Sequence, residues 1–249
     1  MGWPTRLRGP LRAWTASHQD ANRRKDRRDL AELAASFDAI IRAQLDERRA
    51  STSPPDDTTT QLLAERIDGR ALADDELVSI IRNWTAGELG TIAASIGIVV
   101  QHLANDRDLQ ASLRAGAGRC SSVIDEILRL NGPLTTNRRR TTRAVRIGGC
   151  QIGADERITI LWPSANRDEA VFGDGVFDPE AHARDNLLYG SGIHVCPGAP
   201  LTRRELEILV HELLAGTSEI RPTGNPTPAS YPAGGYASVP VTVTKAHTR

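Results

Sequence analysis

The segment YGSGIHVCPG, residues 189–198, holds the side chains best suited to chemistry in this sequence. Cys196 lies just ahead of a stretch with helical periodicity, and the glycines around it permit left-handed backbone conformations. A thiolate is stabilised by the positive end of a helix and by backbone N–H donors. The segment therefore suits a nucleophile with His194 as its base, or a metal ligand. A purely structural cysteine is the third possibility.

Helices are the main elements expected to position this loop. Apolar residues at helical spacing predict helices over 28–50, 61–67, 76–104, 106–115, 119–130 and 200–215. Short hairpin strands are expected within 137–162, a last strand over 238–244, and loops over 51–60 and 163–188. Residues 1–27 are expected to be a poorly defined start, since Pro4 and Pro10 would break a helix. The fold class is therefore mainly α with small β-hairpins.

The long helix predicted over 76–104 contains Gly87, Gly90 and Gly97. Each glycine inside a helix costs on the order of 1 kcal/mol relative to alanine. Three in one helix indicate either that another helix packs close to this backbone or that a ligand does. The local sequence leaves both alternatives open.

Composition excludes several function classes. Thirty-one Lys and Arg balance thirty-one Asp and Glu, and aromatic residues make up only 4% of the chain, so nothing favours nucleic acid as a partner. Three widely spaced cysteines form neither a disulfide framework nor a zinc motif. The most apolar run, 92–104, is shorter than the roughly 20 residues that span a bilayer. We therefore expect a cytoplasmic protein with no membrane contact.

Four segments together resemble the cytochrome P-450 family of haem-thiolate monooxygenases, of the soluble bacterial type. The segment 189–198 resembles the family's aromatic-G-x-G-x-H-x-C-x-G loop, and EILR at 126–129 resembles its E-x-x-R helix. Two further segments match the family in order and spacing: Arg139, which lies six residues after Pro133, and the stretch 165–179. A Glu–Arg pair three residues apart is by itself an ordinary helix contact, so the set carries the resemblance.

The resemblance implies a role for each matching residue. Cys196 would be the axial thiolate of haem iron, a ligand that favours O–O cleavage. Arg139 and His194 would bind the haem propionates. The remaining residues of the implied cofactor site are Tyr189, Gly190, Gly192, Gly198, Ala86 and Gly87. Pro197 has no N–H to offer the sulfur, which implies a lower reduction potential for the iron.

Three departures from the family pattern limit what is implied. Leu89 and Gly90 occupy the positions of the acid and alcohol that deliver protons. Glu88 and Thr91 flank them three residues apart, and either this displaced pair or water in a glycine-loosened helix would carry the protons. Alternatively, Glu88 is only a solvated or salt-bridged carboxylate. Ala181 stands where the family often has a third charged partner for the E-x-x-R pair. Either His182 or Arg184 replaces it, or the pair stands alone.

The third departure is length. The match runs from about residue 28 to the C-terminus. Residues 1–249 therefore resemble a single domain that corresponds to the C-terminal portion of the family's fold and lacks the N-terminal part. One wall of the haem pocket then has no counterpart. Such a chain would be a fragment, would be covered by another chain, or would hold haem poorly.

The implied function is an oxidoreductase that inserts one oxygen atom of O₂ into a small apolar organic substrate, with electrons from a ferredoxin- or flavodoxin-type donor. Two alternatives remain: a truncated, non-catalytic haem-binding module, and a peroxide-using haem-thiolate enzyme, which Leu89 and Gly90 would permit.

Overall fold

The computed structural model describes all residues except 117–119, 232 and 247–249, and for Ala86 the backbone only. The described chain divides into two compact units, Met1–Gly90 and Thr91–Arg249. Helix α4, Asp74–Asn105, contributes to both units, and its predicted span of 76–104 is confirmed within two residues. Each unit is described separately below.

The first unit is helical. It contains η1 (Thr5–Leu7), α1 (Arg8–Arg24), α2 (Arg27–Ala50), α3 (Thr58–Ala64), the two-residue strands β1 (Arg66–Ile67) and β2 (Arg70–Ala71), and the first half of α4. Asp26 caps α2 and Asp57 caps α3, because each carboxylate accepts backbone N–H groups that the first helical turn leaves unpaired. The core of the unit is an apolar cluster that includes Phe37, Ile41, Leu45, Leu77 and Ile81.

Two expectations for this unit were wrong. Residues 1–27 contain a well-formed helix, α1, because Pro10 is its third residue and the first-turn N–H groups of a helix have no intrahelical partner. The loop expected over 51–60 ends three residues early, at Asp57, since that residue starts α3 as its N-cap. The helix expected over 61–67 is shifted accordingly, and Arg66–Ile67 form β1.

The second unit packs helices around one apolar core. The second half of α4, α5 (Arg107–Ala115), α6 (Cys120–Leu130) and α9 (Ala199–Gly216) contribute most of the buried residues. The buried residues of α6 and α9 include Ile124, Ile127, Leu128, Leu206 and Val210. The helices expected over 106–115, 119–130 and 200–215 are confirmed as α5, α6 and α9, and residue 119 of the second lies outside the described residues.

A buried glutamine joins three elements of this unit. The Gln110 side-chain amide donates to the carbonyl oxygens of Leu103 (2.7 Å) and Ile220 (2.9 Å), and its oxygen accepts the Ile220 N–H (3.1 Å). Gln110 is only 1% exposed, so these three bonds satisfy polar groups that water does not reach.

The strands form antiparallel pairs. In the second unit β3 (Thr136–Arg140) pairs with β6 (Arg157–Leu161), and β4 (Val145–Ile147) pairs with β5 (Cys150–Ile152). Nearer the C-terminus β7 (Thr217–Pro222) pairs with β10 (Val241–Lys245), and β8 (Thr227–Pro228) pairs with β9 (Tyr236–Ser238). The expected loop over 163–188 holds two helices of four residues each, α7 (Trp162–Ala165) and α8 (Glu169–Phe172), and η3 (Gly192–His194) follows. The prediction of a mainly helical fold with small two-stranded sheets is confirmed.

Helix α4 is long and apolar enough to cross a membrane, judged by length and composition alone, with a mean hydropathy of 1.2 over its most apolar window. The sequence analysis considered only the run 92–104, but the helix continues beyond that run on both sides. A core helix of a water-soluble protein meets the same criterion, so this single helix is weak evidence for a membrane span. The cytoplasmic location therefore stays a prediction.

Candidate functional site

The loop around Cys196 is closed by its own backbone. The Cys196 N–H donates to the Tyr189 carbonyl oxygen at 2.8 Å, and the Val195 N–H donates to the Gly192 carbonyl oxygen at 3.1 Å. Cys196 is solvent-exposed and precedes the first residue of α9 by three positions. Its sulfur thus lies near the positive end of an 18-residue helix, as the sequence indicated.

Two glycines in this loop are required by its conformation. Gly190 has φ +72° and Gly192 has φ +64°, a region that side-chain-bearing residues seldom adopt. A Cβ atom at Gly190 would also lie 3.3 Å from the His194 carbonyl oxygen. At Gly198 a Cβ atom would lie 3.8 Å from the Cys196 sulfur, so the Gly198 backbone runs close to the sulfur. The glycine spacing therefore serves the path of the chain around the cysteine.

The exposed residues near Cys196 in the sequence are compatible with an apolar cofactor. Ile193 is 96% exposed, Val195 and Leu201 are exposed as well, and so is the Cys196 thiol. No group of three or more His, Cys, Asp or Glu residues that could hold a metal ion occurs among the described residues.

The alternative of a cysteine nucleophile activated by His194 finds no support in the geometry. His194 is exposed at the end of η3, and no hydrogen bond joins its ring to Cys196 in the part of the chain that the structure describes. Nucleophilic catalysis requires the base within hydrogen-bonding reach of the thiol.

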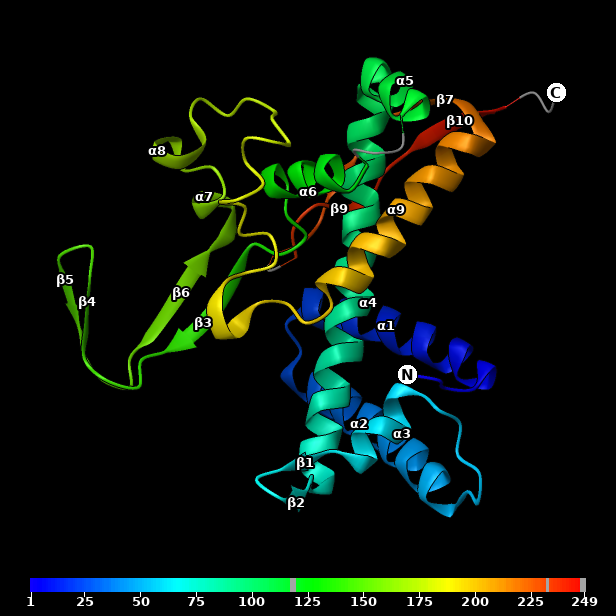
Figure 1. Ribbon diagram of the computed structural model, residues 1–249, viewed down its shortest axis with the longest axis vertical. Coiled ribbons are helices and arrows are strands. Elements are labelled where there is room, and N and C mark those ends of the chain that lie inside the picture. The colour runs from blue at the N-terminus through cyan, green and yellow to red at the C-terminus, as the bar shows by residue number, and fades with distance from the viewer. Residues whose placement is uncertain (117–119, 232, 247–249) are drawn as a thin grey trace. The chain divides into compact units, whose positions relative to one another are not determined.

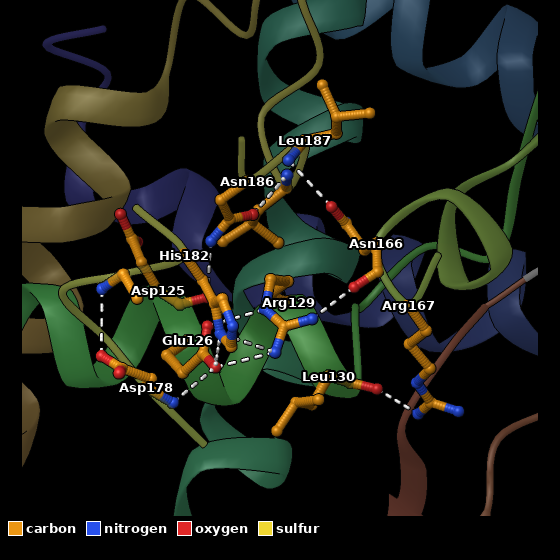
Figure 2. A network of polar contacts seen from close by, with 12 residues as sticks. Asp125, Glu126, Arg129, Leu130, Asn166, Arg167, Asp178, His182, Asn186 and Leu187 are labelled. Atoms are coloured by element: carbon orange, nitrogen blue, oxygen red, sulfur yellow. Dashed lines mark hydrogen bonds and ion pairs between the residues drawn. The ribbon is translucent and has the colours of Figure 1, made fainter. Parts of the chain in front are cut away.

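A buried polar network lies behind the loop, on α6 (Figure 2). Arg129 donates to both carboxylate oxygens of Glu126, from Nε and from Nη2, each at 2.7 Å. Arg129 also donates from Nη1 to the Asn166 carbonyl oxygen, and its guanidinium lies 4.4 Å from the centre of the Phe172 ring. The Arg129 side chain is 0% exposed and that of Glu126 is 2% exposed, so the pair is fully removed from water.

His182 is the third member of this network. Its Nδ1 lies 2.7 Å from Glu126 Oε1 and 3.2 Å from Arg129 Nη2. A carboxylate can only accept, so the short contact requires a proton on Nδ1, and the contact with Arg129 is then not a hydrogen bond. His182 is buried and Arg184 is exposed. Of the alternatives left open by the sequence, the structure selects His182 and excludes both Arg184 and a lone Glu–Arg pair.

The network sets the charge state of Glu126. Burial alone would raise the pKa of Glu126, but hydrogen bonds from Arg129, His182 and the Asp178 backbone outweigh burial and hold the pKa below its usual value. Glu126 is therefore the anion that balances Arg129 inside the fold.

The same network reaches the start of the cysteine loop. Asn166 accepts the Leu187 N–H on its side-chain oxygen at 2.8 Å, and Asn186 donates from its side chain to the Asp125 carbonyl oxygen at 3.1 Å (Figure 2). Asn186 and Leu187 stand directly before the loop 189–198. The polar residues of α6 thus fix where the chain enters the loop.

Tyr189 uses the hydroxyl group that a phenylalanine would lack. Its hydroxyl donates to Asp125 Oδ1 at 3.2 Å, and Arg203 Nε donates to Asp125 Oδ2 at 2.8 Å. The family resemblance implied a place for Tyr189 in the cofactor site but none for Asp125 or Arg203. The only sequence signal for them is that Asp125 adjoins Glu126 and Arg203 lies one turn into α9.

The two residues implied to bind propionates, Arg139 and His194, form no ion pair with a carboxylate among the described residues. Arg139 lies on β3 opposite Ile158, is half-buried, and donates from Nη1 to the Arg138 carbonyl oxygen at 2.9 Å. In the described part of the chain no ion pair involves Arg139 or His194. The Arg139 guanidinium and the His194 ring can therefore both donate to an anionic group.

The residues predicted on α4 belong to both units. Ala86, Gly87 and Glu88 lie in the first unit and Thr91 begins the second, on one continuous helix. A Cβ atom at Gly87 would meet no described atom of its own unit within 4 Å, so close packing inside that unit does not explain this glycine. The roles of these four residues stay predictions.

Comparison with known proteins identifies the family. The family model for cytochrome P450 matches residues 120–224. The cyclomarin C epoxidase of Salinispora arenicola is 36% identical over 72% of this chain and 46% of its own length, and the erythromycin C-12 hydroxylase of Saccharopolyspora erythraea is 31% identical over 75% and 47%. The open structure of cytochrome P450 EryK from S. erythraea superposes with a TM-score of 0.89 at 25% identity, over 100% of this chain and 65% of that one.

The fold is thus that of the cytochrome P450 structures, which confirms the fold class that the resemblance implied. The chain belongs to the cytochrome P450 family, as the four sequence segments predicted. It spans about half the length of the curated relatives that it matches.

Proposed function

We propose that this chain carries the haem-binding part of a cytochrome P450 monooxygenase that oxidises a small apolar organic substrate. The observation that carries the proposal is the Cys196 loop: an exposed thiol ahead of α9, held by the Cys196 N–H bond to Tyr189, with exposed Ile193 beside it. The matched relatives named epoxidase and hydroxylase support oxygen insertion as the reaction. The proposed cofactor is haem, and the proposed electron donor is a ferredoxin- or flavodoxin-type protein.

Each residue of the chain has a defined task in this proposal. Cys196 would bind the iron through its thiolate, and the Gly198 backbone, which runs close to the sulfur, would offer its N–H to it. Arg139 and His194 bind the two propionates as charge-assisted donors. The haem, once bound, supplies the iron that activates O₂. Glu88 and Thr91 hold and transfer protons on α4, while Ala86 and Gly87 leave space beside the helix.

Ligation by Cys196 can be tested directly. The chain is expressed, reconstituted with haem, reduced and exposed to CO, and the absorption band typical of thiolate ligation is recorded. Cys196→Ala should abolish the band. Cys150→Ala is the matched control, because Cys150 is also exposed but lies on β5, and it should leave the band unchanged. A wild-type chain that takes up no haem, or a band that survives Cys196→Ala, would contradict the proposal.

The reaction type needs a second measurement. Oxidation of a panel of apolar substrates with NADH and a surrogate ferredoxin pair should give hydroxylated or epoxidised product, and Thr91→Ala should lower the product formed per electron consumed. Turnover with hydrogen peroxide alone, unaffected by Thr91→Ala, would instead favour a peroxide-using enzyme, which Leu89 and Gly90 at the acid and alcohol positions would allow. Haem uptake without either activity would indicate a non-catalytic haem-binding module.

A further inference from the structure

Three side chains from three elements meet behind the cysteine loop. Asp125 lies on α6, Tyr189 is the first residue of the loop, and Arg203 lies on α9. The Asp125 carboxylate accepts the Tyr189 hydroxyl on Oδ1 (3.2 Å) and Arg203 Nε on Oδ2 (2.8 Å). The Arg203 guanidinium also lies 4.5 Å from the centre of the Tyr189 ring, which closes the cluster. We call these residues the Asp125 cluster.

The electrostatics of the cluster keep Asp125 as the acceptor of its hydrogen bonds and Tyr189 as a donor. Burial and the neighbouring Asp125 carboxylate both raise the pKa of Tyr189, so its hydroxyl keeps its proton and remains a donor. Burial also raises the pKa of Asp125, and the ion pair with Arg203 opposes this rise. A half-buried carboxylate that accepts two hydrogen bonds holds its partners strongly, because hydrogen bonds to charged groups contribute more to stability than those between neutral groups.

The cluster is linked to the cysteine through the backbone of Tyr189. The Tyr189 carbonyl oxygen accepts the Cys196 N–H at 2.8 Å, so the residue whose side chain is anchored to Asp125 also holds the cysteine. Arg203 lies about one turn into α9, the helix that starts immediately after the loop. Asp125 therefore connects the beginning of the loop to the helix at its end.

We propose that Asp125 is a positioning residue that fastens the Cys196 loop in its closed conformation, through the Tyr189 hydroxyl and Arg203, before any cofactor binds. The consequence for haem rests on the proposed function above, whereas the effect on the loop itself does not. A phenylalanine at position 189 would keep the ring over Arg203 but lose the bond to Asp125.

Amide hydrogen exchange of the cofactor-free full chain tests the first part. In Tyr189→Phe and in Asp125→Ala the Cys196 and Val195 amides should exchange about tenfold faster, the factor expected when a hydrogen bond to a charged group is lost. The double variant should exchange little faster than Asp125→Ala alone, because both changes remove the same link. Tyr231→Phe is the matched control, since the Tyr231 hydroxyl bonds Thr136 at 3.0 Å on an exposed strand.

The outcomes distinguish a failure of the proposed role of Asp125 from a failure of the proposed haem binding. Unchanged exchange at Cys196 in both single variants, with circular dichroism showing that they fold, would overturn the proposal. After reconstitution, haem transfer to an excess of apomyoglobin should be about tenfold faster in Tyr189→Phe than in the Tyr231→Phe control. Equal transfer rates would overturn the positioning role towards haem. A wild-type chain that binds no haem would contradict the proposed function alone and leave the exchange result standing.

Discussion

Replacement of Glu126 by glutamine should destabilise the second unit strongly, although it changes the side-chain volume very little. Glutamine keeps one oxygen acceptor but loses the charge that balances Arg129, whose side chain is 0% exposed. Both 2.7 Å bonds between Arg129 and Glu126 are charge-assisted, and His182 donates to the same carboxylate. The variant leaves a buried cation with one neutral glutamine oxygen, the Asn166 carbonyl and the Phe172 ring as its partners, and with no counter-charge.

The size of the effect follows from the burial of the pair. Removing one partner of a fully buried ion pair typically costs about 3 to 5 kcal/mol, because the other charge stays in a medium of low polarity. That is a large part of the roughly 5 to 15 kcal/mol that stabilises a typical domain. Glu126→Gln combined with Arg129→Met should be less destabilised than the single variant, since no cation is then buried without a counter-charge.

Urea unfolding at pH 7, followed by circular dichroism and by amide exchange in α6, measures the effect. The control is Glu32→Gln on α2, which breaks an ion pair with Arg28 whose side chains are 88% and 65% exposed. The control should cost less than about 0.5 kcal/mol, as solvent-exposed helix pairs do. A cost below about 1 kcal/mol for Glu126→Gln, or equal costs for both variants, would refute the argument from burial.

Three further predictions concern the same unit. The folded state lowers the pKa of Glu126, so the contribution of this carboxylate to stability is complete above the ordinary pKa of 4.5 and is lost as the pH falls below it. The difference in unfolding free energy between wild type and Glu126→Gln should therefore shrink between pH 5 and pH 3. A difference that stays constant over this range would contradict the argument. Gln110→Leu should cost about 2 to 4 kcal/mol in urea unfolding, because the buried Ile220 N–H and carbonyl lose their bonds to Gln110 and the Leu103 carbonyl keeps only the Asp106 N–H. A cost near zero would mean that water reaches the Ile220 backbone. Gly235→Ala should lower the thermal midpoint of unfolding, because a Cβ atom at this residue, with φ +75°, would lie 2.7 Å from an Ile98 side-chain atom. Gly148→Ala should have the smaller effect, because Gly148 also has positive φ but a Cβ atom there would meet nothing within 4 Å.

Local patterns predicted most of the helices and the cysteine loop. The helical spacing of apolar residues located α2, α6 and α9 to within a residue or two, because each helix buries one face. The prediction failed for α1, where Pro10 suggested a break but occupies the first turn, a position that needs no N–H. A proline's effect depends on its place in the helix, which the sequence alone did not locate.

Other parts of the site depend on residues that are distant in sequence. The choice of His182 over Arg184 was open because it depends on which side chain the folded chain turns towards α6, 56 residues earlier. The contact between Tyr189 and Asp125 joins residues 64 apart and has no local pattern. The glycines, the cysteine and the helix after it are readable from the sequence because backbone conformation and helix formation are decided by neighbouring residues. The partners that hold that loop in place are decided only when α6, α9 and the segment before the loop pack together, since a buried charge takes whichever counter-charge the fold brings within reach.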